Sequence, residues 1–343
     1  MAKPTFAQVY DDLLTRYGRE IADAFLAAVN DLTSQAQVER VVAALNAGNI
    51  TAAIEAMNLD PAAYNRLIDA IEAGYAAGGE AQVQALPSRD PEGVALILRF
   101  NDRNPRAEAW LRDRSSTLVT RIGEEQRTVI RDALTAGLER GDNPRTVALD
   151  VVGRLDRATG RRVGGVIGLT PQQEAFARNA QVELASGDPA LMRNYLTREL
   201  RDRRFDRTIA KAIRDEAPVP AETIQKALIQ YRNRLLKFRG DMIGRTEALA
   251  SLNAAQDEAL RQLVDTGRVT ASQVRRVWRA TRDRRTRDTH AILDGQSVGL
   301  NEAFRSASGA LIRFPGDPQA PAAETINCRC FIAARISWGA NVR

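Results

Sequence analysis

The stretch VRRVWRATRDRRTRDTHAILDGQ, residues 274–296, marks the point where the helical pattern of the upstream chain ends. Its first six residues, Val274 to Arg279, alternate loosely between apolar and basic side chains, which is typical of a strand. Asp294-Gly295 near its end is a turn signal. The stretch therefore predicts a change from a helical protein to a small mixed module.

The chain downstream supports the same prediction. Pro315-Gly316-Asp317-Pro318 predicts an ordered loop. Residues 328–336 show the period-two pattern of a strand. Every second residue belongs to one set of side chains: Cys328, Cys330, Ile332, Ala334 and Ile336. We therefore expect both cysteines on one strand face and an α+β module over residues 268–343.

The chain upstream is predicted to be helical, so the fold class is mainly α, with multi-helix N-terminal and central regions and the small α+β C-terminal module. Composition divides it into an acidic N-terminal helical region (1–80), a linker or connecting segment (81–106) that contains prolines, and an Arg-rich central helical domain (107–267). Caps followed by proline predict helix starts at Asp60-Pro61, Asn143-Pro144, Thr170-Pro171 and Asp188-Pro189.

Several boundaries follow from glycine and from charge. The helix that starts at Asp60-Pro61 is predicted to end at Gly78-Gly79. Two helices are predicted over 221–238 and 241–265, and Gly267 caps the second. Residues 198–214 carry seven basic and three acidic side chains with apolar residues at helical spacing, which favours an amphipathic surface helix over a phosphate-contacting face.

Composition excludes several classes of protein. The 343 residues contain no run of about 18 apolar residues, as a membrane-spanning helix needs. The first residues lack the order of a signal peptide, so we expect the protein to fold in a cytoplasm. One histidine and two cysteines rule out multi-histidine metal sites and disulfide frameworks, and no glycine-rich nucleotide loop is present.

Charge is unevenly distributed along the chain. Residues 1–80 hold five basic and eleven acidic side chains, a net charge of −6, so the remainder carries +12. Of the 49 basic residues only four are lysines: Lys3, Lys211, Lys226 and Lys237. Arginine suits phosphate or carboxylate partners, although codon bias in a GC-rich genome also inflates arginine. That bias does not explain the asymmetry between the two parts.

Five segments in order resemble the Mu F-like minor head proteins, the head-morphogenesis family of tailed bacteriophages. They are IGRTEAL (243–249), VWRATRDRRTRDTHAILDGQ (277–296), Glu302 with Phe304, FPGDP (314–318) and AAETINCRC (322–330). The signature residues that we expect to be structural are Arg245, Thr246, Glu247, Trp278, Asp283, His290, Asp294, Gly295, Pro315, Gly316, Asp317, Asn327, Cys328 and Cys330. The likeness covers roughly 100 residues, and the helical remainder resembles the family only in length and helicity.

The resemblance implies a virion component that associates with the portal inside the procapsid. The implied partners are the portal protein, a capsid or scaffold protein and packaged double-stranded DNA, with no membrane. The implied location is the capsid interior near the portal, with the host cytoplasm during assembly. We expect neither enzymatic activity nor a cofactor. Two alternatives stay open: a non-specific DNA-binding protein ejected with the genome, and a toxin-like or thiol-dependent enzyme using Cys328 with His290.

Within the signature, four residues are candidates for a zinc site: His290, Asp294, Cys328 and Cys330. His290 and Asp294, four residues apart, are expected on one helix face. The C-x-C spacing and the aspartate are unusual for structural zinc, and a disulfide across this spacing is strained. The sequence favours buried thiols as small core residues, with His290 bonded to a loop carbonyl or to Asn327.

Two arginine sets are candidates for contact with DNA or the portal. They are Arg275, Arg276, Arg279, Arg282, Arg284, Arg285 and Arg287 in the module, and Arg201, Arg203, Arg204 and Arg207 in the central domain. The alternative is that Asp283, Asp288, Asp294, Asp317 and Glu324 pair with the module's arginines and hold its loops together. For Glu247 within Arg245-Thr246-Glu247, we expect a structural ion pair to the C-terminal module in preference to catalysis.

Overall fold

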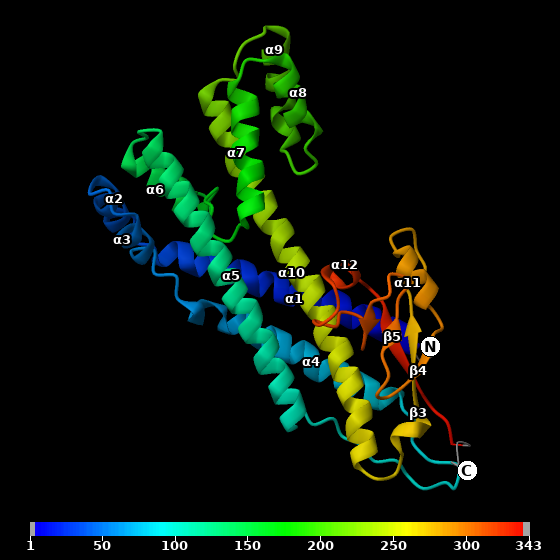
Figure 1. The fold of residues 1–343 in the computed structure, drawn as a ribbon. Helices are drawn as coiled ribbons and strands as arrows, with labels where there is room; N and C mark the ends of the chain where they lie inside the picture. Colours follow the sequence, from blue (N-terminus) through cyan, green and yellow to red (C-terminus); the bar gives the residue numbers. More distant parts are fainter. Residues whose placement is uncertain (1–3, 339–343) are drawn as a thin grey trace. The chain divides into compact units, whose positions relative to one another are not determined.

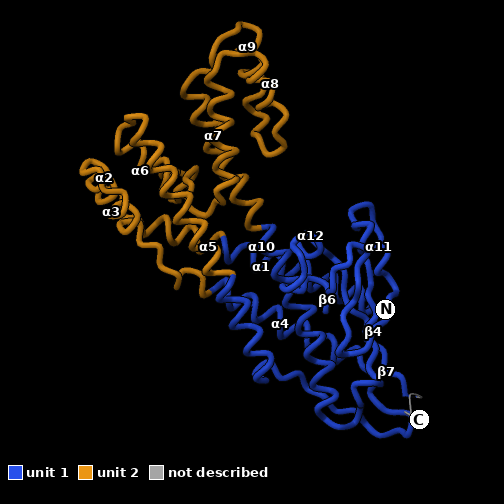
Figure 2. The backbone as a smooth tube through the Cα atoms, in the orientation of Figure 1, with its two compact units in different colours: residues 1–25, 66–117, 241–343 blue, residues 26–65, 118–240 orange. Residues whose placement is uncertain are grey.

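The computed structural model describes residues 4–338 and groups the chain into two compact units (Figure 2). Unit 1 comprises residues 1–25, 66–117 and 241–343, and unit 2 comprises residues 26–65 and 118–240. Each unit therefore combines segments that are distant in the sequence. The predicted boundaries at residues 80, 106 and 267 follow composition along the chain, and they stay predictions about sequence segments.

Helices make up most of the described chain, which confirms the mainly α prediction (Figure 1). The α-helices are α1 (Phe6–Gln35), α2 (Val38–Asn46), α3 (Ile50–Glu55), α4 (Asn65–Ala85), α5 (Pro105–Glu139), α6 (Pro144–Val152), α7 (Pro171–Ala185), α8 (Pro189–Thr197), α9 (Asp206–Arg214), α10 (Ala221–Asp265), α11 (Asp288–Leu293) and α12 (Ala322–Thr325). The strands are β1 (Arg154–Leu155), β2 (Arg162–Val163), β3 (Val274–Arg279), β4 (Ser297–Gly299), β5 (Phe304–Arg305), β6 (Leu311–Ile312) and β7 (Phe331–Ile336). Within the described residues, no helix is both long and apolar enough to cross a membrane.

The core of unit 1 forms around the second half of α10. Every residue from 247 to 260 is buried, so this part of the helix has no solvent face. Close helix crossings explain this: a Cβ on Gly244 would lie 2.1 Å from the Gly18 carbonyl of α1, and a Cβ on Gly78 would lie 2.7 Å from the Leu252 carbonyl. Only glycine permits backbones to approach so closely. α1 and α4 therefore pack directly against α10.

Two predicted helix ends are wrong for the same reason. α4 continues through Gly78-Gly79 to Ala85, and α10 is one helix where two were predicted, with buried Gly240 inside it. A glycine inside a helix costs about 1 kcal/mol relative to alanine, which tertiary packing can offset. Gly267, beyond α10, has the positive φ of a capping residue, as predicted.

The C-terminal module contains an antiparallel sheet in the order β4-β3-β7 and a separate β5-β6 pair. Val274 pairs with Ile336 and Arg279 with Phe331, which confirms the strand predicted over 274–279. β7, the strand predicted over 328–336, begins only at Phe331. Cys328 and Cys330 therefore lie before the strand, and the prediction that they lie within it is wrong. Leu260 and Leu263 of α10 pack against Val274 and Leu300, which joins the module to the core of unit 1.

Unit 2 is a second helical core. The predicted caps are confirmed: Asn143, Thr170 and Asp188 each accept a backbone N–H at the start of α6, α7 and α8. One apolar cluster joins α7 to α10 and includes Leu184, Tyr195, Ile209, Leu228 and Tyr231. β1 and β2 form a short antiparallel hairpin between α6 and α7.

Two predicted segments differ in detail. The helix expected over 198–214 is confined to a 3-10 turn (Arg203–Phe205) and α9, because Asp202 caps the turn by accepting the Arg204 backbone N–H. The segment between α4 and α5 has no strand among its described residues, only an isolated bridge between Arg89 and Ala95. Of the two interpretations of this segment, a linker or a connecting strand, the strand does not form in the described residues.

Candidate functional site

The only histidine of the chain lies in the core of the C-terminal module. His290 belongs to the short helix α11 and is 1% exposed. Its ring meets the edge of Trp278 from β3 at a centroid distance of 5.3 Å, and Trp278 in turn contacts Phe304 at 5.2 Å. The aromatic neighbours exclude water from one side of the imidazole, so its two nitrogens depend on partners from the protein.

One of those partners is a buried carboxylate. Oε2 of Glu324, in α12, lies 2.9 Å from His290 Nε2. The hydroxyls of Thr289, Ser306 and Ser308 also donate to this carboxylate, at 2.6 to 3.1 Å. Burial acts to raise the pKa of Glu324, but these hydrogen bonds and His290 outweigh it and hold that pKa below its usual value. Glu324 is therefore ionised at neutral pH, and its carboxylate accepts a hydrogen bond from the Nε2–H group of His290.

The other nitrogen faces both thiols. His290 Nδ1 lies 3.3 Å from Cys328 Sγ and 3.4 Å from Cys330 Sγ, and each cysteine is 3% exposed. With Nε2 engaged by Glu324, Nδ1 is the ring nitrogen that faces the sulfurs. The turn that brings the thiols together begins at Asn327, whose φ is +57°.

The two thiols are inequivalent. The hydrogen bond that they share lowers the pKa of Cys328, helped by the backbone N–H groups of Cys330 and Arg329 and by the charge of Arg287. The same shared bond raises the pKa of Cys330, and burial raises it further. Of the two thiols, Cys328 therefore loses its proton more readily and Cys330 keeps its proton.

The structure corrects two expectations about this cluster. Asp294 lies beyond the end of α11, accepts from the Ala280 N–H at 3.0 Å and pairs with Arg282, so it is not part of the set. His290 bonds to Glu324 and neither to a loop carbonyl nor to Asn327, whose amide lies 3.0 Å from Met242 Sδ. His290, Cys328 and Cys330 are the group that offers metal-ligand atoms, all within 4.8 Å of one another.

The arginine candidates of the module divide into buried, paired and exposed side chains. Arg276 is 1% exposed, lies 2.7 Å from Asp257 and donates to the Arg313 and Gly299 carbonyls, so it is removed from the contact candidates. Burial lowers the pKa of this guanidinium, against the pull of Asp257. Arg276 instead ties β3 to α10.

Others serve the loops, but the structural alternative holds only in part: of its five acidic residues, Asp294 alone pairs with a candidate arginine among the described residues. Arg282 pairs with Asp294, Arg287 donates to the Ile326 carbonyl and Arg275 lies 3.9 Å from Glu302. Asp283 accepts from Arg329 at 2.6 Å, and that hydrogen bond holds the pKa of Asp283 well below its usual value. Arg279 is half-buried.

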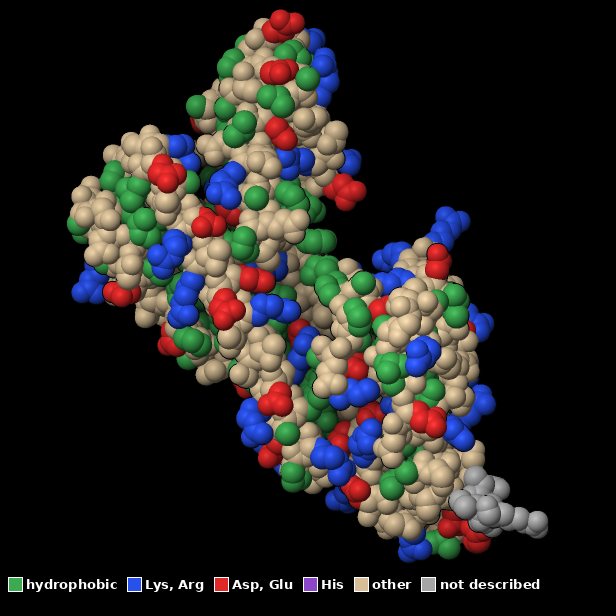
Figure 3. Space-filling view, viewed as in Figure 1, with side chains coloured by type: hydrophobic (Ala, Val, Ile, Leu, Met, Phe, Trp, Pro, Cys, Tyr) green, Lys and Arg blue, Asp and Glu red, His purple; other side chains and the backbone are tan. Residues whose placement is uncertain are grey.

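Two of the module's candidate arginines are both exposed and unpaired among the described residues. The guanidinium groups of Arg284 and Arg285 have no hydrogen-bond or ion-pair partner within residues 4–338. They lie in the loop before α11, and basic side chains project at this end of unit 1 in Figure 3. In the central set, Arg201 pairs with Asp206 and Arg204 with Asp202. The remaining two, Arg203 and Arg207, are exposed, and no side-chain partner lies among the described residues.

The other signature residues are structural. Glu247, 1% exposed, receives two hydrogen bonds of 2.6 Å from Arg114 of α5. The predicted ion pair therefore exists, but its partner is in α5 and not in the C-terminal module, and Arg245 is exposed. Asp317 pairs with Arg313 at 2.6 Å. Around them, Pro315 and Gly316 are buried, Thr246 is half-buried and Gly295 forms the turn after α11.

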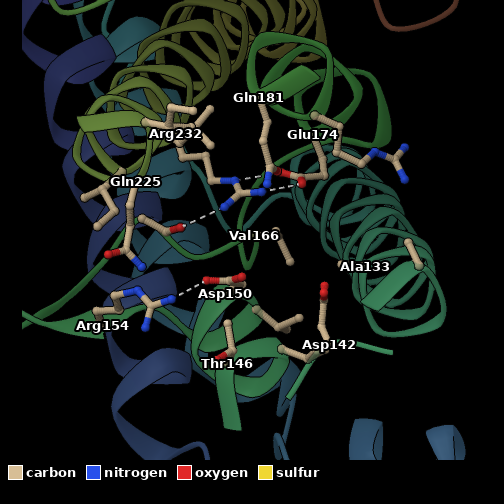
Figure 4. A pocket seen from close by; sticks show the side chains of 18 of the residues that line it. Ala133, Asp142, Thr146, Asp150, Arg154, Val166, Glu174, Gln181, Gln225 and Arg232 are labelled. Carbon is tan, nitrogen blue, oxygen red and sulfur yellow. Dashed lines mark hydrogen bonds and ion pairs between the residues drawn. The ribbon is translucent and has the colours of Figure 1, made fainter. Parts of the chain in front are cut away.

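Unit 2 contains a pocket that sequence reasoning missed (Figure 4). It has a volume of about 550 Å³ and is lined by residues of α5, α6, α7 and α10. Two ion pairs cross its lining: Glu174 with Arg232 at 2.6 Å, and Asp150 with Arg154 at 2.6 Å. No local motif marks this pocket, because its walls come from four helices far apart in the sequence.

Comparison with known proteins places the resemblance on part of the chain. Residues 192–333 match the family model described as Phage Mu protein F like protein, which confirms the family prediction for this region. A second match is the Uncharacterized protein YqbB of Bacillus subtilis (strain 168), 31% identical over 91 residues. That alignment covers 26% of this chain and 28% of the relative, so the chain matches just over a quarter of that relative's length. No solved structure matches the chain significantly.

The matched region is therefore Mu F-like, and it supports a phage head-morphogenesis role in general terms. It begins about 50 residues before IGRTEAL, at α8, and ends inside β7. It includes His290, Glu324, both cysteines and both arginine sets. The pocket of unit 2 lies mostly outside it.

Proposed function

We propose that this protein is a minor head protein of a tailed phage or prophage, which associates with the portal in the procapsid and contacts packaged DNA. The observation that carries the proposal is the family match over residues 192–333, which spans the ordered motifs and the folded module that they build. The motifs meet in space around His290, α10 and the three-stranded sheet. They have the properties of a structural signature more than those of an active site.

DNA contact is supported by exposed arginines whose side chains form no ion pair within the described residues. Five of the eleven candidate arginines form ion pairs within the fold. Arg284, Arg285, Arg203 and Arg207, by contrast, are exposed, without side-chain partners among the described residues. Guanidinium groups bind phosphate oxygens without reading sequence, and each contact releases counterions. Binding through these groups would be non-specific and steeply dependent on salt.

Contact with the portal, or with a capsid or scaffold protein, is supported by the acidic N-terminal region. The net charge of −6 over residues 1–80 is unsuited to DNA and suited to a basic protein surface. Within this region Asp11, Asp12 and Asp23 are exposed on α1. We propose the head interior near the portal as the location.

A thiol-dependent enzyme is the alternative that one observation favours. Glu324, His290 and Cys328 form a carboxylate–imidazole–thiol series with distances of 2.9 and 3.3 Å. Their burial opposes this function, because all three are at most 5% exposed and a substrate cannot reach the sulfur. Thiol labelling of the native protein distinguishes the two: cysteines that react only after denaturation exclude a nucleophile.

Sedimentation with the phage's portal protein and with DNA, over a salt series, tests the proposal. We expect stable portal association, together with DNA binding that weakens steeply as salt rises. The double variant Arg284→Ala/Arg285→Ala should flatten the salt dependence of DNA binding. Arg16→Ala/Arg19→Ala is the matched control, since it removes two exposed arginines from the acidic region and should leave DNA binding unchanged.

Each outcome has a distinct meaning. DNA binding without portal association would favour a packaged DNA-binding protein ejected with the genome. If the protein binds the portal and the folded variant Arg284→Ala/Arg285→Ala binds DNA as the wild type does, Arg284 and Arg285 are not part of the DNA contact. Binding to neither partner would contradict the proposal.

A further inference from the structure

We propose that His290, Cys328 and Cys330 bind one zinc ion in the C-terminal module. Three donor atoms, one nitrogen and two sulfurs, converge from α11 and from the turn before β7 to within 4.8 Å of one another. The set is built from the only histidine and the only two cysteines of the chain. The inference stands independently of the portal and DNA contacts proposed above.

The spacing of the donors is close to that of a zinc site. With Zn–S and Zn–N bonds of about 2.3 and 2.05 Å, tetrahedral geometry separates sulfur from nitrogen by about 3.6 Å. The two sulfurs lie 3.3 and 3.4 Å from Nδ1. Both sulfur–nitrogen distances are therefore within a few tenths of an ångström of those in a tetrahedral site.

The surroundings orient the donors as metal sites require. A metal-bound histidine usually donates its other N–H to a carboxylate, and Glu324 occupies this position at 2.9 Å from Nε2. The hydroxyls of Thr289, Ser306 and Ser308 hold that carboxylate in turn. The Cys330 N–H points at Cys328 Sγ over 3.4 Å, a contact that favours thiolate. Nδ1 is left to face the sulfurs.

Other uses of the cluster explain less of this geometry. Small core residues have no need to direct two sulfurs at one ring nitrogen, nor to place an ionised carboxylate behind that ring. A nucleophile needs one thiol and an open approach, whereas both thiols are 3% exposed. A disulfide between residues 328 and 330 would be strained and would not involve the histidine.

The donor set selects zinc among the common metals. Two thiolates and an imidazole are soft to borderline ligands, unlike the oxygen donors that calcium and magnesium prefer. Two thiolates also balance the charge of a divalent ion. Three protein donors leave one of the four positions to a water molecule. The ion would fasten α11 to the turn before β7 in a module with short strands, where a metal adds the stability that a small core lacks.

Metal analysis of the full chain, purified reduced and without a histidine tag, tests the inference. We expect about one zinc per chain, and a cobalt-loaded sample should show thiolate-to-cobalt charge transfer. Cys328→Ser/Cys330→Ser should lose the metal, and Glu324→Gln should weaken zinc affinity by about 10- to 100-fold. Asp294→Asn is the control, because Asp294 lies outside the donor set, and it should keep the metal.

A readout on the unaltered chain covers the case in which these variants do not fold. Zinc added to metal-free wild-type protein should raise its thermal midpoint, and a chelator should reverse this effect. Absence of stoichiometric zinc, with no change in the midpoint, would overturn the inference in favour of buried core thiols. Equal zinc in the folded double cysteine variant would overturn it too.

Discussion

Among single residues, the buried charged side chains of this protein form ion pairs that join helices and strands. Arg276 and Glu247, each 1% exposed, lie in pairs that join β3 and α5 to α10. Removing one partner of a buried pair leaves an uncompensated charge, which costs about 3–5 kcal/mol. The arginine excess of the sequence thus has two uses, and exposure separates the internal pairs from groups such as Arg284 that are free to meet phosphate.

Tyr64 gives the fold a pH dependence that can be measured. Burial raises the pKa of this phenol to about 12, although Arg239 and the Gln126 hydrogen bond of 2.5 Å act to lower it. Because the folded-state pKa lies above the unfolded value of about 10, the contribution of neutral Tyr64 to stability is complete below pH 10 and is lost as pH rises from 10 to 12. The loss appears as alkaline destabilisation.

We therefore expect the free energy of unfolding of the wild type, relative to Tyr64→Phe, to fall by on the order of 1 kcal/mol between pH 9 and pH 11. Urea unfolding of both proteins at a series of pH values measures this difference. Parallel pH curves for the two proteins would mean that Tyr64 ionises with an ordinary pKa in the folded state.

At the scale of elements, close helix crossings decide the core of unit 1. A Cβ on Gly78 of α4 would lie 2.7 Å from the Leu252 carbonyl and 2.8 Å from its Cα, both backbone atoms that cannot rotate away. Gly78→Ala should therefore reduce the free energy of unfolding by about 1–3 kcal/mol, through overpacking. Thermal or urea unfolding provides the measurement.

Gly123→Ala is the matched control for that variant. Gly123 lies inside α5 and its Cβ would meet nothing within 4 Å. The substitution should stabilise the protein by about 0.5–1 kcal/mol through helix propensity alone. If both variants stabilised the protein equally, α4 and α10 would not cross as closely as Gly78 and Leu252 indicate.

The elements also show what sequence patterns predict well. Cap-then-proline pairs mark the starts of α6, α7 and α8, because Asn143, Thr170 and Asp188 satisfy local backbone donors whatever the rest of the fold does. Glycine is less informative. Gly78 and Gly240 lie inside helices, since contacts from elsewhere in the chain overcome their low helix propensity.

The candidate site was predictable in composition but not in arrangement. Residue type alone marks His290, Cys328 and Cys330. The spacing of Asp294 wrongly predicts a fourth member, because α11 ends at Leu293. Charge groups Glu324 with the arginines, because nothing local indicates that its carboxylate faces an imidazole 34 residues away. The turn at Asn327 brings the thiols together without a strand.

At the scale of the whole molecule, the division into two units was outside the reach of sequence patterns. Unit 1 unites residues 1–25, 66–117 and 241–343, and such grouping depends on long-range packing that composition along the chain does not record. The family match has a similar property, since residues 192–333 contribute to both units. The Mu F-like region is thus a stretch of sequence and not one compact body.

We propose above that the protein is a minor head protein that associates with the portal. Quantitative mass spectrometry of purified procapsids and filled heads, from the phage or induced prophage that encodes it, tests this proposal. We expect the protein in both particles, far below the amount of the major capsid protein, and we expect procapsids that lack the portal to lose it. Absence from purified particles, with the protein found only in the host lysate, would contradict the proposal.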